Sequence, residues 1–306
     1  MIDKRPLGAT GIEVSAVGLG AWQLGRSAEW PTGPDPDDAR RIVRAALDAG
    51  VTFIDTAPGY AGGQSELNVG AALAGVPRDR YVLCTKFGHR PDGGTDWSAS
   101  AIEPSIRGSA ERMGVEHIDV VLLHNPPPEV IGSDEHYSAL EEVAQKGLIR
   151  AYGASVDTSR ELDALPPAVS VTEVRLSALY QEPLRAIRPG TIVKVPLESG
   201  WLSGRYDAES AFTDVRARWS PADVALRAAL VEEFHGLLPE GMSTVEGALR
   251  FLLSYPEVST VIPGTRSLDH LAVSIAAVAE GALPRDTVDA VESWYAERIG
   301  DRALSW

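Results

Sequence analysis

The sequence predicts an α/β fold, a single (β/α)8 TIM barrel spanning residues 1–306. Short apolar segments alternate with amphipathic helical patterns from one end of the chain to the other. The apolar segments are continuous, as expected of parallel strands buried on both faces. A doubly wound open sheet is the alternative, but no G-x-G-x-x-G sequence follows the first strand, which weakens it.

Each strand is predicted from one apolar segment. The eight strands are expected at 17–22, 53–57, 82–88, 120–125, 151–156, 169–177, 191–197 and 258–265. The segment before them, KRPLGATGIEV, is predicted to form a short N-terminal hairpin around Gly8 to Gly11.

The first helix is predicted after Asp35, which can cap it, with Pro36 at the first helical position. One face of this helix carries an apolar stripe formed by Ala39, Ile42, Val43 and Ala46. Further helices are expected at about 64–75, 98–114, 135–147, 159–165, 182–188, 244–256 and 267–279. Two extra helices, at about 222–238 and 285–299, fall outside the alternation.

Composition and charge exclude several classes of partner. With 43 acidic and 28 basic residues the net charge is −15, so neither nucleic acid nor an anionic membrane is an expected partner. The longest unbroken apolar run, 275–279, is far shorter than the roughly 20 residues of a membrane span. The segment MIDKRPLGAT has no apolar core of a signal peptide. The single cysteine, Cys84, suits a reducing cytosol, and a cytoplasmic protein is expected.

Polar side chains stand where successive predicted strands end. Asp55 ends the second strand, Tyr60 follows it in the loop, Lys86 ends the third strand and His124 ends the fourth. Since the carboxyl ends of barrel strands share one face, these four side chains are predicted to meet at one mouth. Each alone has an ordinary structural explanation, such as a turn, a packed ring or a lysine that reaches solvent. Their convergence is what favours chemistry.

Together the four side chains suit acid catalysis. A phenol has a pKa of about 10 and is a weak proton donor at neutral pH. The ammonium of Lys86 would lower the pKa of Tyr60, and Asp55 would keep Lys86 charged. His124 would complete a hydrogen-bond path to a substrate oxygen. The set predicts a general acid that protonates a carbonyl oxygen while hydride reaches the carbon.

Other chemistries fit the strand ends less well. Metal hydrolases need several converging ligands, and only His124 and Asp55 qualify, so no metal is expected. The strand-end carboxylates available for glycoside hydrolysis, Asp55 and Glu173, are on distant strands. No G-x-S-x-G sequence is present, and the strand position of Cys84 favours an inert thiol.

These residues belong to a wider pattern. The chain contains, in this order, RPLGATGIEVSAVGLGAW, GVTFIDTAPGY followed by SE, TKFG, LLHNP, GLIRAYGAS, VPLESGWLSGRY and VIPGTRS. In the order and spacing of these motifs it resembles the aldo-keto reductases over nearly its whole length. The resemblance implies a (β/α)8 barrel that binds an extended nicotinamide cofactor without a Rossmann domain. It places Asp55, Tyr60, Lys86 and His124 in the catalytic tetrad, with Tyr60 as the acid.

The resemblance implies an oxidoreductase that reduces an aldehyde, ketone or aldose to an alcohol, or catalyses the reverse reaction. NADPH is the expected cofactor and NADH the alternative; a cofactor-binding regulatory subunit with little turnover is the alternative function. The residues expected at the cofactor are Gly20, Ala21, Asp55, Ser155, Glu173, Lys194, Pro196, Leu197, Ser199, Gly200, Leu202, Gly264, Thr265, Arg266, His270 and Ser274. The residues expected at the substrate are Trp22, Tyr60, His89, Trp97, His124, Asn125 and Trp201. No feature selects one carbonyl or sugar, a direction of reaction or an oligomeric state.

Several positions depart from the family pattern at the nicotinamide. Val156 stands where the family often has Asn after Ser155, Glu173 replaces a common Gln, and Leu176-Ser177 replaces Tyr-Asn. Lys194 aligns with an aromatic residue that commonly stacks on the nicotinamide. Lys194 is expected either to line the cofactor with its aliphatic stem or to pair with Glu173 or Glu198.

The segment PGTRSLDHL after the eighth strand predicts a turn and a helix that begins at Ser267. The N–H groups of a helix start and the guanidinium of Arg266 suit a phosphate, and the resemblance implies the adenosine 2′-phosphate. The family often has Lys where Gly264 stands and Arg where His270 stands. His270 is expected to strengthen NADPH binding as pH falls through about 6.5. The alternative is that Ser267 only caps the helix and Arg266 only offsets Asp269.

Overall fold

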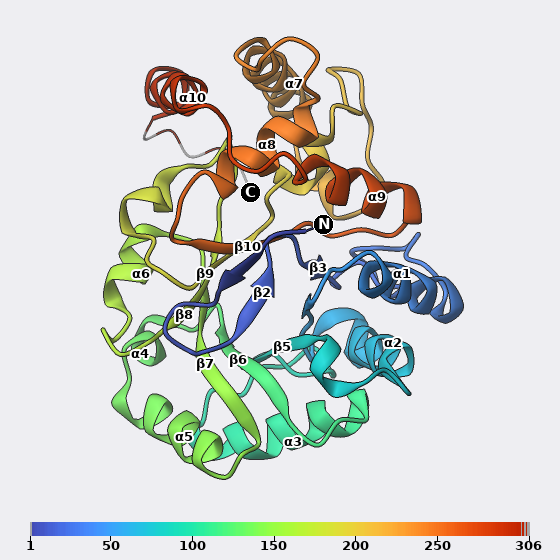
Figure 1. Cartoon of the computed structure of the whole chain (residues 1–306), viewed down its shortest axis with the longest axis vertical. Coiled ribbons are helices and arrows are strands. Elements are labelled where there is room, and N and C mark those ends of the chain that lie inside the picture. Colours follow the sequence, from blue (N-terminus) through green and yellow to red (C-terminus); the bar gives the residue numbers. More distant parts are fainter. Residues whose placement is uncertain (1, 301, 303, 305–306) are drawn as a thin grey trace.

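The computed structural model describes residues 2–300, 302 and 304, and it forms a parallel eight-stranded barrel (Figure 1). Neighbours in the sheet follow chain order, which confirms the predicted (β/α)8 barrel. The strands are β3 (Leu19–Gly20), β4 (Phe53–Asp55), β5 (Val82–Phe87), β6 (Ile118–His124), β7 (Ile149–Val156), β8 (Val171–Arg175), β9 (Thr191–Lys194) and β10 (Val258–Ile262). The assignment of residues 1–306 to one domain stays a prediction.

Main-chain hydrogen bonds beside the short strand β3 close the barrel. The amide of Gly18 donates to the carbonyl oxygen of Val261 at 2.8 Å, and the amide of Val261 donates to that of Ala16 at 3.0 Å. Glycine is needed at position 20, because a Cβ there would lie 2.8 Å from the carbonyl oxygen of Ile262. The first predicted strand therefore contributes mostly irregular backbone to the closure.

The predicted hairpin consists of antiparallel strands β1 (Lys4–Pro6) and β2 (Glu13–Ser15). Figure 1 shows it crossing one end of the barrel. Its buried Leu7, Ile12 and Val14 pack in one apolar cluster with inward-facing strand residues such as Phe53 and Val120. The hairpin thus covers the amino-terminal end of the barrel, and the carboxyl ends of the strands remain open.

Most predicted helices are present around the barrel. They are α1 (Pro36–Asp48), α2 (Gln64–Leu73), α3 (Ile102–Met113), α5 (Asp134–Gln145), α6 (Ser159–Ala164), α8 (Thr244–Leu253) and α9 (Leu268–Ala277). The two extra helices are α7 (Pro221–Gly236) and α10 (Arg285–Arg298), which lie together beyond one side of the barrel in Figure 1. Asp35 caps α1 as predicted, since its side chain accepts a hydrogen bond from the amide of Asp38. No helix among the described residues is both long and apolar enough to cross a membrane.

Two helical segments differ from the prediction. The helix expected at 182–188 is a short 3-10 helix, η4 (Glu182–Ala186), because Pro189 disfavours helical backbone at Arg188 and ends the segment early. An unpredicted single turn, α4 (Pro128–Ile131), follows β6. The expected strand 191–197 also ends early, at Lys194, because Val195 has a left-handed backbone with φ of 56°.

The inward face of the barrel changes from apolar to polar at the open end. Side chains two residues apart on a strand face the same way, so the residue two positions after an inward apolar residue also faces inward. The apolar layer contains Phe53, Cys84, Leu122, Val171 and Ile192. Two residues further along the same strands stand Asp55, Lys86, His124, Glu173 and Lys194. This second layer forms the floor of the candidate site.

The close approach of β7 to β8 gives a test of the packing. A Cβ on Gly153 would lie 1.8 Å from the carbonyl oxygen of Val171. We expect Gly153→Ala to lower the free energy of unfolding by about 1–3 kcal/mol, because the two strands must separate. Urea denaturation measures this change. A Cβ on Gly236 in α7 meets no atom within 4 Å, so Gly236→Ala is the matched control and should not destabilise the protein. Equal stability of Gly153→Ala and the wild type would contradict the packing argument.

Candidate active site

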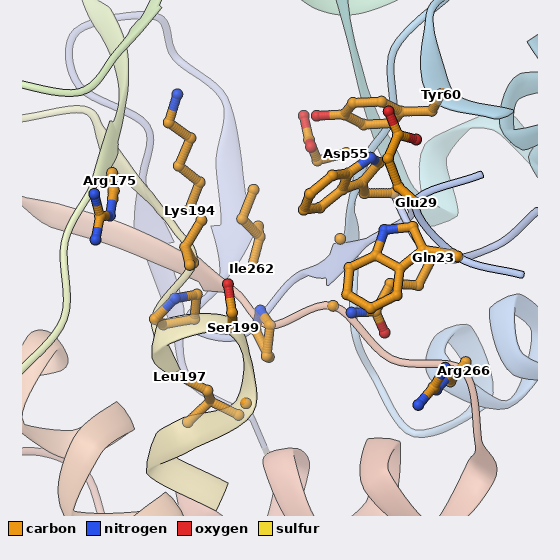
Figure 2. Close-up of a pocket in the computed structure, with 18 of the residues that line it drawn as sticks. Gln23, Glu29, Asp55, Tyr60, Arg175, Lys194, Leu197, Ser199, Ile262 and Arg266 are labelled. Atoms are coloured by element: carbon orange, nitrogen blue, oxygen red, sulfur yellow. The ribbon is translucent and has the colours of Figure 1, made fainter. Parts of the chain in front are cut away.

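The open end of the barrel holds a cavity of about 640 Å³. The carboxyl ends of the strands and the loops that follow them line it. Figure 2 shows Tyr60 and Asp55 on one side of the cavity, Lys194 and Arg175 across from them, and Arg266 at a separate end. The cavity is therefore elongated. Asp55, Tyr60 and Lys194 lie at one end, and the cation Arg266 lies at the other.

A buried ion pair joins β4 to β5. Lys86 Nζ donates to both carboxylate oxygens of Asp55, at 2.6 and 2.7 Å, and to the carbonyl oxygen of Thr56 at 3.1 Å. The register produces this contact, since Asp55 pairs with Cys84 and Lys86 is the next residue of β5 on the same face. Removing one partner of such a buried pair costs about 3–5 kcal/mol. The pair fixes the ammonium under the cavity.

Glu173 of β8 is a second carboxylate beside Lys86. Its Oε2 lies 3.4 Å from Lys86 Nζ, and its Oε1 accepts a hydrogen bond from Ser155 Oγ at 2.8 Å. Glu173 is only 1% exposed, and among the described residues its Oε2 has no hydrogen-bond partner. The sequence pointed to Glu173 as a replacement at the cofactor, and the structure brings it into the same charged cluster as Asp55 and Lys86.

The protonation of this cluster follows from burial and from its neighbours. Burial and Glu173 raise the pKa of Asp55 to about 7, against the opposing effect of Lys86. Burial lowers the pKa of Lys86, but Asp55 and Glu173 outweigh it and raise that pKa well above its usual value. Lys86 is therefore charged at neutral pH, and the two carboxyl groups compete for a single ammonium.

Tyr60 lies against this cluster, with its ring centroid 5.2 Å from Lys86 Nζ. Burial raises the pKa of Tyr60; Lys86 lowers it, and the carboxylates of Asp55 and Glu173 raise it again, so that the net shift is upward. Lys86 lowers the pKa of Tyr60, as predicted. The net pKa of Tyr60 is nevertheless raised, contrary to the expectation, because desolvation of the phenolate outweighs the effect of the ammonium. Tyr60 carries its proton at neutral pH.

His124 stands next to Tyr60, with 5.7 Å between their ring centroids in an edge-on arrangement. Burial lowers the pKa of His124 well below its usual value, and the positive charges of Lys86 and Lys194 lower it further. His124 Nδ1 is buried without a hydrogen-bond partner among the described residues. A neutral imidazole in this position can donate one hydrogen bond to an oxygen in the cavity.

Lys194 at the end of β9 has partners different from those expected. Its Nζ forms a salt bridge with Asp157 at 2.9 Å and donates to Asn125 Oδ1 at 2.7 Å and Ser155 Oγ at 2.8 Å. The expectation that it pairs with Glu173 or Glu198 was therefore wrong. Asp157 was missed because it follows the predicted strand. Its place two residues after Ser155 was the available signal.

Glu198 pairs with a different cation, Arg175 of β8, at 2.9 Å. Both side chains are buried, and Glu198 starts the 3-10 helix η5 (Glu198–Ser203) that borders the cavity. Glu198 and Ser199 have left-handed backbones, with φ of 47° and 54°. Residues of this kind persist only where their surroundings hold them. The Arg175–Glu198 pair provides such a restraint for the loop after β9.

The start of α9 brings several basic groups to the far end of the cavity. Ser267 caps the helix, since its Oγ accepts a hydrogen bond from the amide of His270 at 3.2 Å. Arg266 lines the cavity and donates to Thr32 Oγ1. Arg205, which the sequence analysis missed, is hydrogen-bonded to the imidazole of His270. It comes from the loop after η5 and is separated from His270 by 65 positions, so no local pattern links the two.

Most residues predicted at the site line this cavity. They are Gly20, Trp22, Asp55, Tyr60, His89, His124, Asn125, Glu173, Lys194, Pro196, Leu197, Ser199, Gly200, Gly264, Arg266, His270 and Ser274. Others are buried close to it without lining it: Ala21, Lys86, Ser155, Leu202 and Thr265.

Two predicted substrate residues require correction. Trp97 packs on Phe87 and His89, at ring-centroid distances of 5.8 and 6.0 Å, and does not line the cavity. Trp201 is fully buried in an aromatic cluster that includes Trp219. Both indoles pack against other rings and not on the cavity wall.

The loops 23–33 and 203–219 supply lining residues that the sequence analysis did not name. These are Gln23, Glu29, Trp30, Ser203, Arg205, Tyr206 and Arg216. The two loops meet where the amide of Val215 donates to the carbonyl oxygen of Glu29 at 3.1 Å. The path of a long loop is set by such tertiary contacts, which a periodic pattern does not encode.

The barrel and the charged groups at its strand ends define a class of protein, an α/β-barrel enzyme with a protonated phenol at its mouth. Residues 16–296 match the aldo/keto reductase family, and the chain belongs to that family of oxidoreductases. It is similar to L-galactose dehydrogenase of Arabidopsis thaliana, with 31% identity over 91% of this chain and 89% of that protein. It is also similar to the NADH-specific methylglyoxal reductase of Escherichia coli K12, with 28% identity over 95% of this chain and 100% of that protein. The holo form of an aldo-keto reductase from Bacillus halodurans superposes with a TM-score of 0.80 at 25% identity, covering 100% and 98% of the two chains.

The low pKa of His124 gives a direct test of the site's electrostatics. We expect the ring-proton NMR signals of His124 not to titrate between about pH 8 and about pH 5.5, because burial and neighbouring cations disfavour the imidazolium. Comparison with His124→Gln assigns the signals. In the urea-unfolded chain all six histidines should titrate near pH 6.5, as the control. A folded-state midpoint for His124 near that value would contradict the burial argument.

Proposed function

We propose that this chain reduces a small carbonyl compound to an alcohol, or catalyses the reverse, with Tyr60 as the proton donor. The observation that carries the proposal is a protonated phenol placed against a buried ammonium at the mouth of the barrel. A bound nicotinamide cofactor supplies the hydride in the reductive direction. Tyr60 gives its proton to the carbonyl oxygen as negative charge develops there.

The other charged groups act on Tyr60 and on the carbonyl oxygen. Lys86 stabilises the phenolate that remains when Tyr60 gives up its proton, and Asp55 holds Lys86 in place through two short hydrogen bonds. His124, as a neutral imidazole, donates a hydrogen bond to the same carbonyl oxygen and orients it. Each role matches the protonation state that the surroundings of the residue impose.

The cavity also has the features that a nicotinamide cofactor requires. Glu173 Oε2 is a buried polar atom without a hydrogen-bond partner among the described residues, available to a ligand at the floor. The helix start at α9, with Arg266 and the Arg205–His270 pair, offers positive groups to a phosphate at the far end. Ser199 and Gly200 line the wall between them.

The wall near Tyr60 suits a small polar substrate. Trp22, His89 and Asn125 line the cavity beside Tyr60 and His124. Aromatic faces with a few polar groups bind carbonyl compounds and sugars. The names of the two relatives, an L-galactose dehydrogenase and a methylglyoxal reductase, support a substrate of this class.

We also propose that NADPH is preferred over NADH. Arg266 and Arg205 support this preference, although one relative is named as NADH-specific. Burial, Arg205 and Arg266 lower the pKa of His270, so protonation of His270 strengthens phosphate binding only at a pH below the expected value of about 6.5. The two arginines therefore carry the preference at neutral pH.

Loss of the Tyr60 hydroxyl tests the proposed chemistry. Across a panel of aldehydes, ketones and aldoses, Tyr60→Phe should lower the rate of NADPH oxidation by about 10²–10⁴-fold, because the general acid is lost. Its affinity for NADPH should stay close to that of the wild type. Tyr152→Phe, which removes a hydroxyl bonded to Glu141 outside the cavity, is the matched control and should retain wild-type rates. A Tyr60→Phe enzyme with wild-type turnover would show that Tyr60 is not the acid.

The same panel separates the enzyme from the alternative of a regulatory subunit. A wild-type protein that binds NADPH tightly but turns over no carbonyl on the panel would favour the regulatory function, since both functions need the cofactor groove.

The cofactor preference is tested at the start of α9. We expect Arg266→Ala to weaken NADPH binding by about 10–100-fold, the effect of one charge-assisted hydrogen bond, and to leave NADH binding unchanged. Titration of both cofactors by fluorescence measures the two affinities. Arg40→Ala on the exposed face of α1 controls for the loss of a positive charge. Equal wild-type affinities for NADH and NADPH, or an Arg266→Ala protein that keeps the full preference, would overturn the assignment.

A further inference from the structure

The positive charge around Glu173 is too small to balance the negative charge of its carboxylate. At the carboxyl ends of the strands, each of three cations has a closer carboxylate partner. The pairs are Lys86 with Asp55 at 2.6 Å, Lys194 with Asp157 at 2.9 Å and Arg175 with Glu198 at 2.9 Å. Glu173 shares Lys86 with Asp55 at 3.4 Å and has no other ion pair among the described residues. When Asp55, Glu173 and Lys86 are all ionised, their cluster carries one net negative charge at the floor of the cavity.

This excess charge is buried at the floor of the cavity. Glu173 lines the cavity, and its Oε2 lacks a hydrogen-bond partner within the part of the chain that the structure describes. An uncompensated carboxylate is unfavourable in a buried site unless a cation or a proton neutralises it. A glutamine of the same shape would meet the hydroxyl of Ser155 without this penalty. The charge therefore points to a ligand that carries positive charge at this position.

We propose that Glu173 makes the site distinguish the redox states of its cofactor, because its carboxylate favours the cationic oxidised nicotinamide over the neutral reduced ring. This inference rests on the proposed function, in which the nicotinamide end of the cofactor binds beside Glu173. Preferential binding of the oxidised form also moves the equilibrium on the enzyme from carbonyl toward alcohol, since the oxidised cofactor is the product of carbonyl reduction. Glu173 thereby sets the direction that the bound site favours.

The groups that face Glu173 determine how the effect depends on pH. Asp55 and Lys86 face it from β4 and β5, Ser155 faces it from β7, and Lys194 on β9 reaches it through Ser155. Tyr60 and the thiol of Cys84 complete the surroundings, and both keep their protons because the pKa of each is raised. Asp55 takes up a proton as pH falls through about 7, the value to which burial and Glu173 raise its pKa against the effect of Lys86. This proton cancels the excess charge, so redox discrimination weakens at low pH.

Binding measurements test the inference without turnover. The dissociation constants of NADP⁺ and NADPH are measured by titration for the wild type and Glu173→Gln at about pH 8. The ratio of the oxidised to the reduced constant should rise roughly tenfold in Glu173→Gln, the order of effect of one nearby unit charge. Asp269→Asn, which removes an exposed carboxylate at the far end of the groove, is the matched control. Its ratio should stay within about twofold of the wild type, because a distant exposed charge is screened.

A second measurement uses the wild type alone and decides the question if Glu173→Gln does not fold. Its ratio should rise between about pH 8 and about pH 6 as Asp55 gains its proton. Protonation of His270 affects both cofactor forms equally and cancels in the ratio. A folded Glu173→Gln protein with an unchanged ratio overturns the inference and leaves the proposed function standing; without a folded variant, a pH-independent wild-type ratio does the same. A wild type that binds neither NADP⁺ nor NADPH overturns the proposed function and the inference together.

Discussion

The buried ammonium of Lys86 is the interaction on which the rest of the site depends. It has two hydrogen bonds to Asp55, one to the carbonyl of Thr56, and a close approach to Glu173. Because an isolated charge in such a place is very unfavourable, the strands that carry these groups must stay in one register. The phenol of Tyr60 is then fixed relative to a charge that does not change at neutral pH.

The alternation of side chains along each barrel strand places these groups. On β4, β5, β6, β8 and β9 the inward position after the apolar layer is polar, so charges from several strands reach one floor at nearly the same height. The apolar residues below, such as Phe53 and Cys84, exclude water from beneath the ammonium. This arrangement strengthens every electrostatic effect at the floor and accounts for the large pKa shifts of Asp55 and His124.

Sequence reasoning could predict the strand ends because parallel strands must bring their carboxyl ends together. It therefore found Asp55, Lys86 and His124, whose positions follow from apolar segments alone. It misplaced Trp201 in η5 and missed Arg205 in the loop after η5, because the path of the chain after β9 depends on tertiary contacts. The direction of the Tyr60 pKa shift was also missed, since a sequence shows which charges are present but not how completely they are desolvated.

Two departures from the family pattern are physically one change. Lys194 Nζ donates to Ser155 Oγ, and Ser155 Oγ donates to Glu173 Oε1, so one hydroxyl connects the new cation to the new anion. Lys194 is already paired with Asp157 at 2.9 Å, so the chain through Ser155 polarises the carboxylate of Glu173 without neutralising it. The hydroxyl of Ser155 both accepts and donates a hydrogen bond in this chain, so its role does not depend on the residue after it, Val156. At the floor of the cavity, a hydrogen-bonded chain with a charged group at each end thus links β7, β8 and β9, where the family pattern has uncharged residues.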